Sequence, residues 1–440
     1  MVDAQPFRGL RYNLQKTGDL SSLITPPYDI ISTEQQHAFY ERNPYNLIRL
    51  EMGKDFSDDT PESNRYTRAA AIVEEWIRDG VLIREERPAY YLIEHCFPYR
   101  GQERSYWGLI AAVRLEELDT GTIRATEITM DAPLEDRFNL IKSCRVNLSP
   151  IMGAFIQKQG DLLTLLPDLD SAKPDMRGTD DFGVTFNLWV IDGENDIKKV
   201  NQFLTGKSIY IADGHHRYTT ALTYRKGQLG INDNSDDIRN FVMMTLISSN
   251  DRGLTMLPTH RLIRGLTQEQ LASLKDKLGK YFSIQELSPS SSDSSENLRQ
   301  WMEALTKVGN DGTVFGIYGL ETGKYLLLMP HNVAALYDML PPEYPLEWRK
   351  LDVSLLHGIV LQDILGLSAP EKQKECLEFS PDDDLLFRKV EKGDAQLAVF
   401  LNPAPITSVM AVADAGHRMP QKSTYFYPKT PAGMVMNPLF

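Results

Sequence analysis

The sequence predicts a mixed α+β protein. Three observations lead to this prediction: short apolar runs with period-two alternation, other stretches with apolar residues at helical spacing, and turn residues between the two kinds. The composition agrees, since 42% of the 440 residues are hydrophobic and 24% are charged, as in ordinary globular proteins. A chain of this length predicts roughly two or three domains. Collagen-like, mucin-like and wholly disordered proteins are excluded.

Helices and one strand are expected in the N-terminal part. Ser32 and Gln35 have the spacing of a capping box, which predicts a helix running toward Tyr40. Residues 43–51 indicate a turn followed by a strand. Residues 62–79 have apolar side chains at helical spacing and therefore predict a longer helix.

The middle of the chain is dominated by strand patterns. Alternation or continuous apolar runs predict strands at residues 89–93, 105–113, 122–128, 148–155, 186–191 and 208–212, with a charged helix at 133–145. The C-terminal part mixes both patterns. It predicts helices at 271–281, 298–305 and 353–365, a hairpin over 313–318 and 324–329, and a Ser-rich polar loop at 288–296. We therefore expect two domains, residues 1–250 and an additional α+β region over residues 251–440.

Charge and cysteine usage narrow the function classes. The chain has 47 Lys and Arg against 60 Asp and Glu, a net charge of −13, which argues against a protein that neutralises many nucleic-acid phosphates. Three cysteines without a CxxC pair exclude a disulfide framework and a thiolate zinc site. No apolar run reaches the ~20 residues that span a bilayer, and no secretory signal is visible. We expect a soluble, cytoplasmic protein with neither DNA nor membrane as a partner.

One apparent phosphate motif is rejected. Gly206-Lys207-Ser208 matches the end of a P-loop, but position 201 is Asn where that motif needs glycine. A P-loop lysine also opens a helix, whereas the residues after Lys207 predict a strand.

A different junction between a strand and a helix has the features of an anion site. The apolar residues 208–212 run into Asp213 and Gly214, and a helix is predicted directly after them. Such a turn exposes backbone N–H groups at the positive end of a helix dipole, where anions bind. Gly214 allows close approach of the backbone or a positive φ. The sequence therefore predicts a phosphate-binding loop over residues 213–218.

The side chains of this loop extend the prediction. Arg217 has a planar, permanently charged fork that suits phosphate oxygens, and His215 and His216 add hydrogen-bond donors, or positive charge when protonated. Asp213 lies at the strand end, where it can hold a metal ion or accept a proton from a hydroxyl. The alternative is structural: Asp213 caps the helix and Arg217 pairs with a nearby acid.

This loop resembles the phosphate-binding loop of the ParB/sulfiredoxin superfamily, above all that of its free-serine kinase branch. The chain as a whole resembles a large bacterial and archaeal family of unknown function in that superfamily. The residues that carry this wider resemblance are 26–31, 43–46, 213–218, 257–262 and 419–429. The resemblance implies a ParB/sulfiredoxin-like nucleotide-binding core with large insertions.

The loop residues of this chain match the three branches of the superfamily to different degrees. Sulfiredoxins have a nucleophilic cysteine where this chain has His215. ParB proteins bind CTP and add a helix-turn-helix, which we do not find, and a charge of −13 does not suit a DNA clamp. By resemblance to the serine kinases, Gly214, His215, His216 and Arg217 hold the terminal phosphates of ATP or ADP. Asp213 then lies beside Mg²⁺ or the acceptor hydroxyl, and we expect His216 to be a catalytic residue as well.

Such kinases use a separate glutamate as a base for the acceptor hydroxyl. Glu127 is the preferred candidate, although the family usually has a histidine just before it and this chain has Thr126. Glu51 is the other candidate. For either residue, the structural alternative is a solvent-exposed carboxylate at a strand end.

Two further segments carry candidate binding residues. His260 and Arg261 suit a second anion contact or, equally, a surface ion pair. Lys422 is the preferred lysine of an aromatic segment near the C-terminus, which alternatively docks the tail on the core.

The sequence thus predicts a nucleotide-dependent, magnesium-requiring phosphotransferase that acts on a small hydroxylated metabolite, most specifically free serine, in either direction. The alternative is a nucleotide-binding sensor of ParB type without metabolite kinase activity.

Overall fold

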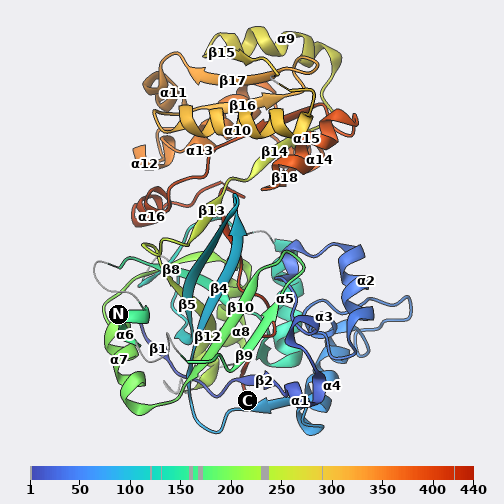
Figure 1. Cartoon of the computed structure of the whole chain (residues 1–440), viewed down its shortest axis with the longest axis vertical. Coiled ribbons are helices and arrows are strands. Elements are labelled where there is room, and N and C mark those ends of the chain that lie inside the picture. Colours follow the sequence, from blue (N-terminus) through green and yellow to red (C-terminus); the bar gives the residue numbers. More distant parts are fainter. Residues whose placement is uncertain are drawn as a thin grey trace. The chain divides into compact units, whose positions relative to one another are not determined.

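The chain folds into two units (Figure 1). The computed structural model describes residues 2–118, 121–129, 131–157, 162–166, 172–228, 237–289, 291–420 and 422–440. Unit 1 comprises Met1–Ala125, Thr129–Thr255 and Phe426–Phe440, and unit 2 comprises Thr126–Ile128 and Met256–Tyr425. Unit 2 is therefore inserted into unit 1. The expected division near residue 250 differs from this arrangement in two respects, because Phe426–Phe440 lie in unit 1 and Thr126–Ile128 lie in unit 2.

Unit 1 is built on a mixed sheet of nine strands among the described residues, in the order β6-β11-β8-β12-β5-β4-β10-β9, with β1 paired to β5. The strands of unit 1 are β1 (Ala4–Gln5), β2 (Leu10–Tyr12), β3 (Leu82–Arg84), β4 (Tyr90–Tyr99), β5 (Gln102–Arg114), β6 (Ile123–Ala125), β7 (Val146–Asn147), β8 (Ile151–Phe155), β9 (Met176–Thr179), β10 (Thr185–Ile191), β11 (Ile209–Asp213), β12 (Phe241–Ser248) and β21 (Asn437–Pro438). Because β11 pairs with β6 in parallel and with β8 in antiparallel fashion, the start of β8 lies beside the end of β11.

The helices of unit 1 are α1 (Leu14–Thr17), α2 (Thr33–Arg42), α3 (Ile48–Glu51), α4 (Arg65–Arg78), α5 (Asp131–Cys144), α6 (Leu162–Leu165), α7 (Glu194–Leu204) and α8 (His215–Gln228), with short 3₁₀ turns η1 (Leu20–Ser22), η2 (Tyr28–Ile30) and η4 (Ile238–Asn240). Helices α7 and α8 bury Val200 and Tyr218 in one core with Leu109 and Met244 of the sheet. Removing this apolar surface from water stabilises the junction between β11 and α8, at about 25 cal/mol per Å².

Unit 2 contains an antiparallel sheet of six strands in the order β15-β17-β16-β19-β14-β18. Its strands are β14 (His260–Ile263), β15 (Phe282–Leu287), β16 (Phe315–Tyr318), β17 (Tyr325–Pro330), β18 (Leu377–Ser380) and β19 (Leu397–Phe400). Its helices are α9 (Gln268–Gly279), α10 (Ser294–Gly309), α11 (Val333–Met339), α12 (Leu346–Arg349), α13 (Asp352–Leu355), the π-helical segment η5 (Leu356–Ile364), α14 (Pro370–Cys376), α15 (Asp383–Glu391) and α16 (Ile406–Asp414). The strands β13 (Thr255–Leu257) and β20 (Tyr425–Tyr427) connect the units.

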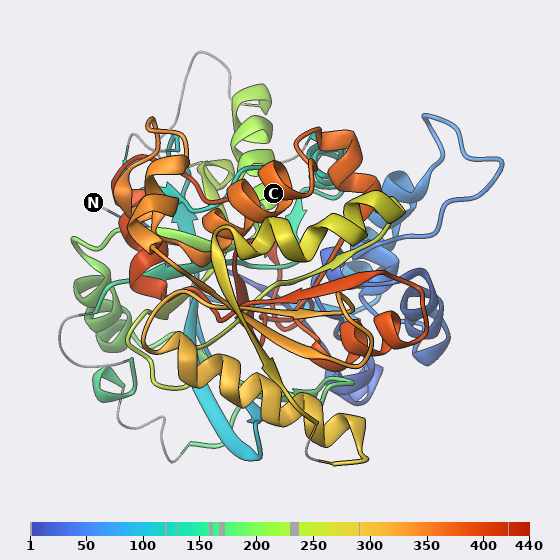
Figure 2. The ribbon, with the colours of Figure 1, turned by 90° about the horizontal axis from the view of Figure 1, so that it is seen from above.

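Two apolar cores lie on opposite faces of the six-stranded sheet. Leu278 of α9 packs in the same core as Ile317, whereas Trp301 of α10 packs in the same core as Tyr318, the next residue of β16. Successive residues of a strand point to opposite faces, so α9 and α10 cover opposite faces of the sheet, as Figure 2 shows.

The prediction of a mixed α+β protein is confirmed by these two sheets and their helices. The strand predicted within residues 43–51 is wrong, because Ile48–Glu51 form helix α3. Asn46 causes the difference by accepting a hydrogen bond from the backbone N–H of Ile48 at 2.9 Å, which starts a helical turn. The predicted loop 288–296 also ends earlier, since Asp293 caps α10 and Ser294 begins it.

Among the described residues, no helix is both long and apolar enough to cross a lipid bilayer.

Candidate functional site

The predicted phosphate loop lies at the end of β11, in unit 1. A β-bulge interrupts the pairing of β11 with β8 between Ile211 and Asp213. Bulges re-aim the side chain that follows them. Asp213 is the last residue of the strand and His215 is the first residue of α8, so the predicted strand–glycine–helix turn is present at these residues.

Gly214 connects the strand to the helix with a positive φ of +90°. A Cβ atom at this position would lie 2.9 Å from Nε and from Nη2 of Arg217. Glycine is therefore required for two reasons: the backbone conformation is unfavourable for other residues, and the arginine side chain folds back against the glycine.

The guanidinium of Arg217 is bound by three groups of the protein. Its Nη2 lies 2.7 Å from Oδ2 of Asp213, and its Nη1 donates to Oγ of Ser149 at 3.0 Å and to the carbonyl oxygen of Pro150 at 2.6 Å. The buried Nε has no hydrogen-bond partner among the described residues. Arg217 therefore braces the end of β11 against the start of β8 and keeps one donor unsatisfied.

A second cation reaches Asp213 from the C-terminal segment of unit 1. Nζ of Lys429 lies 2.6 Å from Oδ1 of Asp213 and 2.9 Å from Oδ2 of Asp29. Burial alone would raise the pKa of Asp213, but attraction to Lys429 and Arg217 outweighs burial and lowers it. Asp213 is therefore an ionised carboxylate at neutral pH, held between two cations.

The contacts of Asp213 thus join residues that the resemblance had linked only by sequence: residues 26–31 supply Asp29, residues 213–218 supply Asp213, and residues 419–429 supply Lys429. A protein family described as "Protein of unknown function (DUF1015)" matches residues 4–354 of the chain. The chain belongs to this family. The segment that carries Lys429 lies outside the residues matched to DUF1015.

Several solved structures are more distantly similar to this chain. A conserved hypothetical protein from Pyrococcus furiosus has 14% sequence identity and a TM-score of 0.35, covering 71% of this chain and 90% of that one. A free serine kinase in complex with AMP has 11% identity and a TM-score of 0.34, covering 71% and 92%. A variant of a free serine kinase in complex with ADP has 11% identity and a TM-score of 0.35, covering 69% and 84%. SbnI from Staphylococcus aureus, with a C-terminal truncation, has 11% identity and a TM-score of 0.32, covering 75% and 87%. No curated protein matches the chain.

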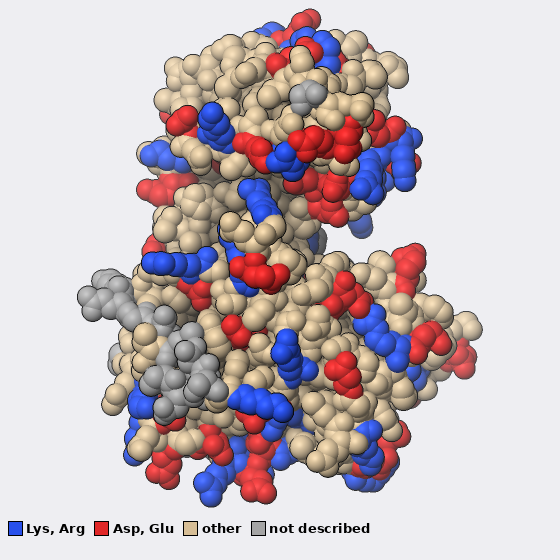
Figure 3. Space-filling view, viewed as in Figure 1, with Lys and Arg blue, Asp and Glu red and all other residues tan. Residues whose placement is uncertain are grey.

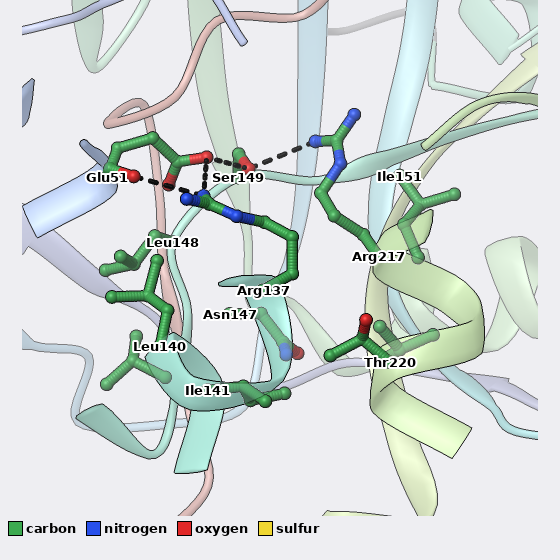
Figure 4. Close-up of a pocket in the computed structure, with 12 residues that line it drawn as sticks. Glu51, Arg137, Leu140, Ile141, Asn147, Leu148, Ser149, Ile151, Arg217 and Thr220 are labelled. Carbon is green, nitrogen blue, oxygen red and sulfur yellow. Dashed lines mark hydrogen bonds and ion pairs between the residues drawn. The ribbon is translucent and has the colours of Figure 1, made fainter. Parts of the chain in front are cut away.

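Beside Arg217, this DUF1015 chain has a small pocket that contains Glu51 (Figure 4). The pocket has a volume of about 50 Å³, and Glu51, Arg137, Ser149 and Arg217 are among the residues that line it. Oγ of Ser149 donates to Oε1 of Glu51 at 2.9 Å and accepts from Arg217 at 3.0 Å. Figure 4 shows Ser149 between Glu51 and Arg217, with Arg137 directed toward Glu51. Glu51 is thereby coupled to the phosphate loop through one hydroxyl.

Arg137 holds Glu51 from the other side. Its Nη1 donates to the backbone carbonyl of Glu51 at 3.0 Å and lies 3.5 Å from Oε1. Its guanidinium also lies 4.0 Å from the ring centroid of Tyr28 and pairs with Asp136. Glu51 is only 2% exposed. The expectation of a solvent-exposed carboxylate therefore does not apply to Glu51.

The remaining loop residues have mixed roles. His215 is buried and His216 is partly exposed, both in the first turn of α8. The hydroxyl of Tyr218 donates to the carbonyl oxygen of Glu116 at 2.8 Å and accepts from the backbone N–H of the same residue at 2.9 Å. Tyr218 is therefore a core residue that fixes α8.

Glu127, the preferred base, lies in unit 2 instead. Its Oε1 accepts hydrogen bonds from the backbone N–H groups of Ser423 and Thr424, at 3.2 and 3.0 Å, and from Oγ1 of Thr424 at 2.9 Å. Burial raises its pKa, and the hydrogen bonds from Thr424 oppose that rise. In this position Glu127 orders the chain of unit 2 near residue 423.

His260 and Arg261 also lie in unit 2 and are both buried. Nδ1 of His260 accepts from the backbone N–H of Leu401 at 3.1 Å, and Nε2 lies 2.6 Å from Oδ1 of Asp383. Both ring nitrogens therefore have partners. Arg261 donates to the carbonyl oxygens of Thr259 and Lys422. Lys422 itself is exposed, and it is Lys429 that reaches Asp213.

Three residues of this site escaped the sequence prediction as site residues: Lys429, Ser149 and Arg137. Lys429 carried a signal, because it belongs to the aromatic and lysine-rich segment that also contains Lys422. No sequence pattern marked Ser149 or Arg137 as a site residue. The role of Ser149 comes from the pairing of β8 with β11, and the role of Arg137 comes from the packing of α5.

The site suits a phosphate group better than a pre-formed metal centre. Among the described residues, no group of three or more His, Cys, Asp or Glu side chains could hold a metal ion. Each oxygen of Asp213 already faces a cation. By contrast, the unsatisfied Nε of Arg217 and the start of α8 offer donors to an anion. A Mg²⁺ ion bound together with a nucleotide needs only one or two protein carboxylates, and Asp213 is the carboxylate at this turn.

Proposed function

We propose that this protein is a nucleotide-dependent phosphotransferase whose acceptor is a small hydroxylated metabolite, free serine being the most specific candidate. One observation carries the proposal: an ionised, partly buried aspartate, Asp213, stands at a strand–glycine–helix turn beside Arg217, which has a donor that no described residue satisfies. Residues 213–217 of this turn have the sequence Asp-Gly-His-His-Arg, which resembles the corresponding loop of free-serine kinases.

The residues of the loop have distinct roles in this proposal. The first turn of α8, with His215 and His216, holds the terminal phosphates of ATP or ADP, and Arg217 neutralises their charge through the donor that the protein leaves open. Bound Mg²⁺ would supply further charge neutralisation on the phosphates. Asp213 orients the acceptor hydroxyl or that ion. Its lowered pKa makes it a weak proton acceptor and a lasting negative charge.

The acceptor's proton needs a different residue. Glu51 lies in the same unit as the loop and shares Ser149 with Arg217, whereas Glu127 lies in unit 2, where Oε1 accepts three hydrogen bonds from Ser423 and Thr424. We therefore favour Glu51 over Glu127 as the acidic partner of the loop. Because Glu51 is buried, it acts on the acceptor through the hydroxyl of Ser149 or after local opening of the pocket.

A nucleotide sensor without kinase activity is the second candidate. The observation in its favour is that Arg217 and Lys429 already neutralise Asp213 within the protein, which leaves a site for phosphates without a vacant catalytic acid. A role in DNA binding has less support, because basic and acidic side chains are interspersed on the face shown in Figure 3.

Calorimetry and product analysis test the proposal together. We expect the full chain with Mg²⁺ to bind ATP or ADP, and ³¹P NMR to detect a new phosphomonoester when serine or another hydroxylated metabolite is added. Arg217→Ala should weaken nucleotide binding about tenfold or more, as loss of a charge-assisted contact does. Lys226→Ala is the matched control, because Lys226 lies on the same helix and pairs with the exposed Glu117.

The results separate the two candidates. Binding without any phosphomonoester across the metabolite panel supports the sensor and overturns the kinase. Binding that Arg217→Ala leaves unchanged overturns the assignment of the phosphate loop itself.

A further inference from the structure

Unit 2 contains a cavity that belongs to none of the features described so far. Its volume is about 280 Å³, and all its lining residues lie in unit 2. The wall includes Arg261 of β14, Asp352 at the start of α13, and apolar residues such as Pro258, Leu401 and Pro403. Polar and apolar residues both line this concave cavity, and a few well-placed polar groups are what fix a small molecule in such a site.

Arg261 is a buried cation that forms no ion pair within the described part of the chain. The residue is only 3% exposed. Its hydrogen bonds go to the carbonyl oxygens of Thr259 and Lys422, and its guanidinium lies 5.0 Å from the ring centroid of Phe379. No described carboxylate forms an ion pair with it, although Glu127 attracts it from a longer distance. Burial therefore lowers the pKa of Arg261 to about 10.

Asp352 lines the same cavity and carries the opposite charge. It is partly buried, and no cation of the described residues forms an ion pair with it. Burial raises its pKa to about 6, and a hydrogen bond from Thr313 offsets the rise only in part. Arg261 and Asp352 line the same cavity without pairing with each other, so the space between them separates a positive from a negative charge.

Unpaired buried charges are costly, and proteins compensate them with partners or ligands. A ligand that completes this cavity needs a carboxylate for the planar fork of Arg261 and a cationic group for Asp352. Lys350, the other charged residue of the lining, is exposed and is screened by solvent. Pro258, Leu401 and Pro403 are among the apolar residues that remain to contact the rest of the ligand.

We propose that this cavity of unit 2 binds a free α-amino acid, with the carboxylate on Arg261 and the ammonium on Asp352. This site is separate from the phosphate loop in unit 1, and the inference does not depend on the proposed phosphotransferase activity.

The first test compares matched ligands. Thermal shift of the full chain against each common L-amino acid identifies those that bind, and calorimetry then gives their affinities. For L-alanine as the probe, the matched compounds are L-lactate, which replaces the ammonium by a hydroxyl, and ethylamine, which lacks the carboxylate. We expect amino acids to bind at least about tenfold more tightly than either type of matched compound.

The second test uses variants of the cavity. Asp352→Asn and Arg261→Met should each weaken binding of the selected amino acid about tenfold or more. Asp338→Asn is the control, since Asp338 is an exposed acid of α11 with 85% of its side chain accessible. Asp352→Asn conserves the shape of the side chain and keeps the test decisive if Arg261→Met fails to fold.

Three outcomes would overturn the inference. In the first, no amino acid shifts the melting temperature. In the second, the hydroxy acid or the amine binds as tightly as the matched amino acid. In the third, Asp352→Asn retains the wild-type affinity.

Discussion

The ammonium of Lys429 lies 2.6 Å from a carboxylate oxygen of Asp213, although half the chain separates the two residues in sequence. The same ammonium binds Asp29, so a single lysine joins the N-terminal proline turn, the end of β11 and the C-terminal segment. The candidate site is therefore assembled from three distant parts of the sequence around one cation.

Replacing Lys429 by alanine should lower the free energy of unfolding by about 3 kcal/mol, because it leaves two carboxylates without their shared buried counter-charge. The side chain of Lys429 is only 8% exposed, so solvent cannot replace it fully. Lys422→Ala is the control, since Lys422 is exposed in the same segment. Urea denaturation measures both variants. Equal, small changes in the free energy of unfolding would show that the ion pairs of Lys429 do not stabilise unit 1.

Replacing Gly214 by alanine should destabilise the protein more than replacing Gly206. Both residues have a positive φ, +90° and +79°, so alanine is strained at either position by about 1 kcal/mol. Only at position 214 does the new Cβ meet Arg217, at 2.9 Å, while nothing lies within 4 Å at position 206. We expect an additional cost of about 1–3 kcal/mol at Gly214 and loss of nucleotide binding there alone. Melting temperatures and calorimetry of the two variants provide the comparison.

The lowered pKa of Asp213 predicts a specific response to acid. Because its pKa is lower in the folded than in the unfolded chain, the unfolded state takes up a proton first as the pH falls. The stabilisation from Asp213 is thus complete above its ordinary pKa of about 3.9 and is lost at lower pH. Asp213→Asn should be less stable at neutral pH and should lose less stability on acidification. Melting curves that stay parallel for both proteins between neutral and acidic pH would contradict this assignment.

Asp352 should behave in the opposite way. Its pKa is raised to about 6, so the folded state holds the proton more tightly and stability falls as the pH rises from about 4 to about 6. Asp352→Asn should therefore stabilise the ligand-free protein at neutral pH, by about 1–2 kcal/mol, and should have no such effect in acid. Asp338→Asn, the exposed control, should change little at either pH. Denaturation at two pH values checks this, and a destabilised Asp352→Asn at neutral pH would refute it.

His260 should prove to be a structural residue of unit 2. His260→Ala leaves the buried N–H of Leu401 without its acceptor, at a cost of about 1–3 kcal/mol. His260→Asn offers an oxygen near the position of Nδ1 and should recover part of that cost. Nucleotide affinity should be unchanged in both variants. A weakened nucleotide affinity with normal stability would instead favour the anion contact expected from the sequence.

The fold and the site differ in how far the sequence could predict them. The turn at Gly214 was predictable, because an apolar strand, a glycine and a helix start are local signals. Helix α3 was not, since a short apolar run such as Leu47–Leu50 fits a strand as well as a buried helix. The pairing of Lys429 with Asp213 depends on contacts between distant segments, which periodicity does not reveal. The adjacent polar pair of His260 and Arg261 suggested a surface, yet both side chains are buried by the strands around β14.

The insertion of unit 2 into unit 1 has a consequence for biosynthesis. A ribosome makes Asp29 and Asp213 before residues Met256–Tyr425 of unit 2, and it makes Phe426–Phe440 with Lys429 only afterwards. Until that last segment leaves the exit tunnel, Arg217 is the only partner of Asp213 among these residues. The loop of the nascent chain therefore stays incomplete while unit 2 already has all its residues, and residues translated after unit 2 complete the site.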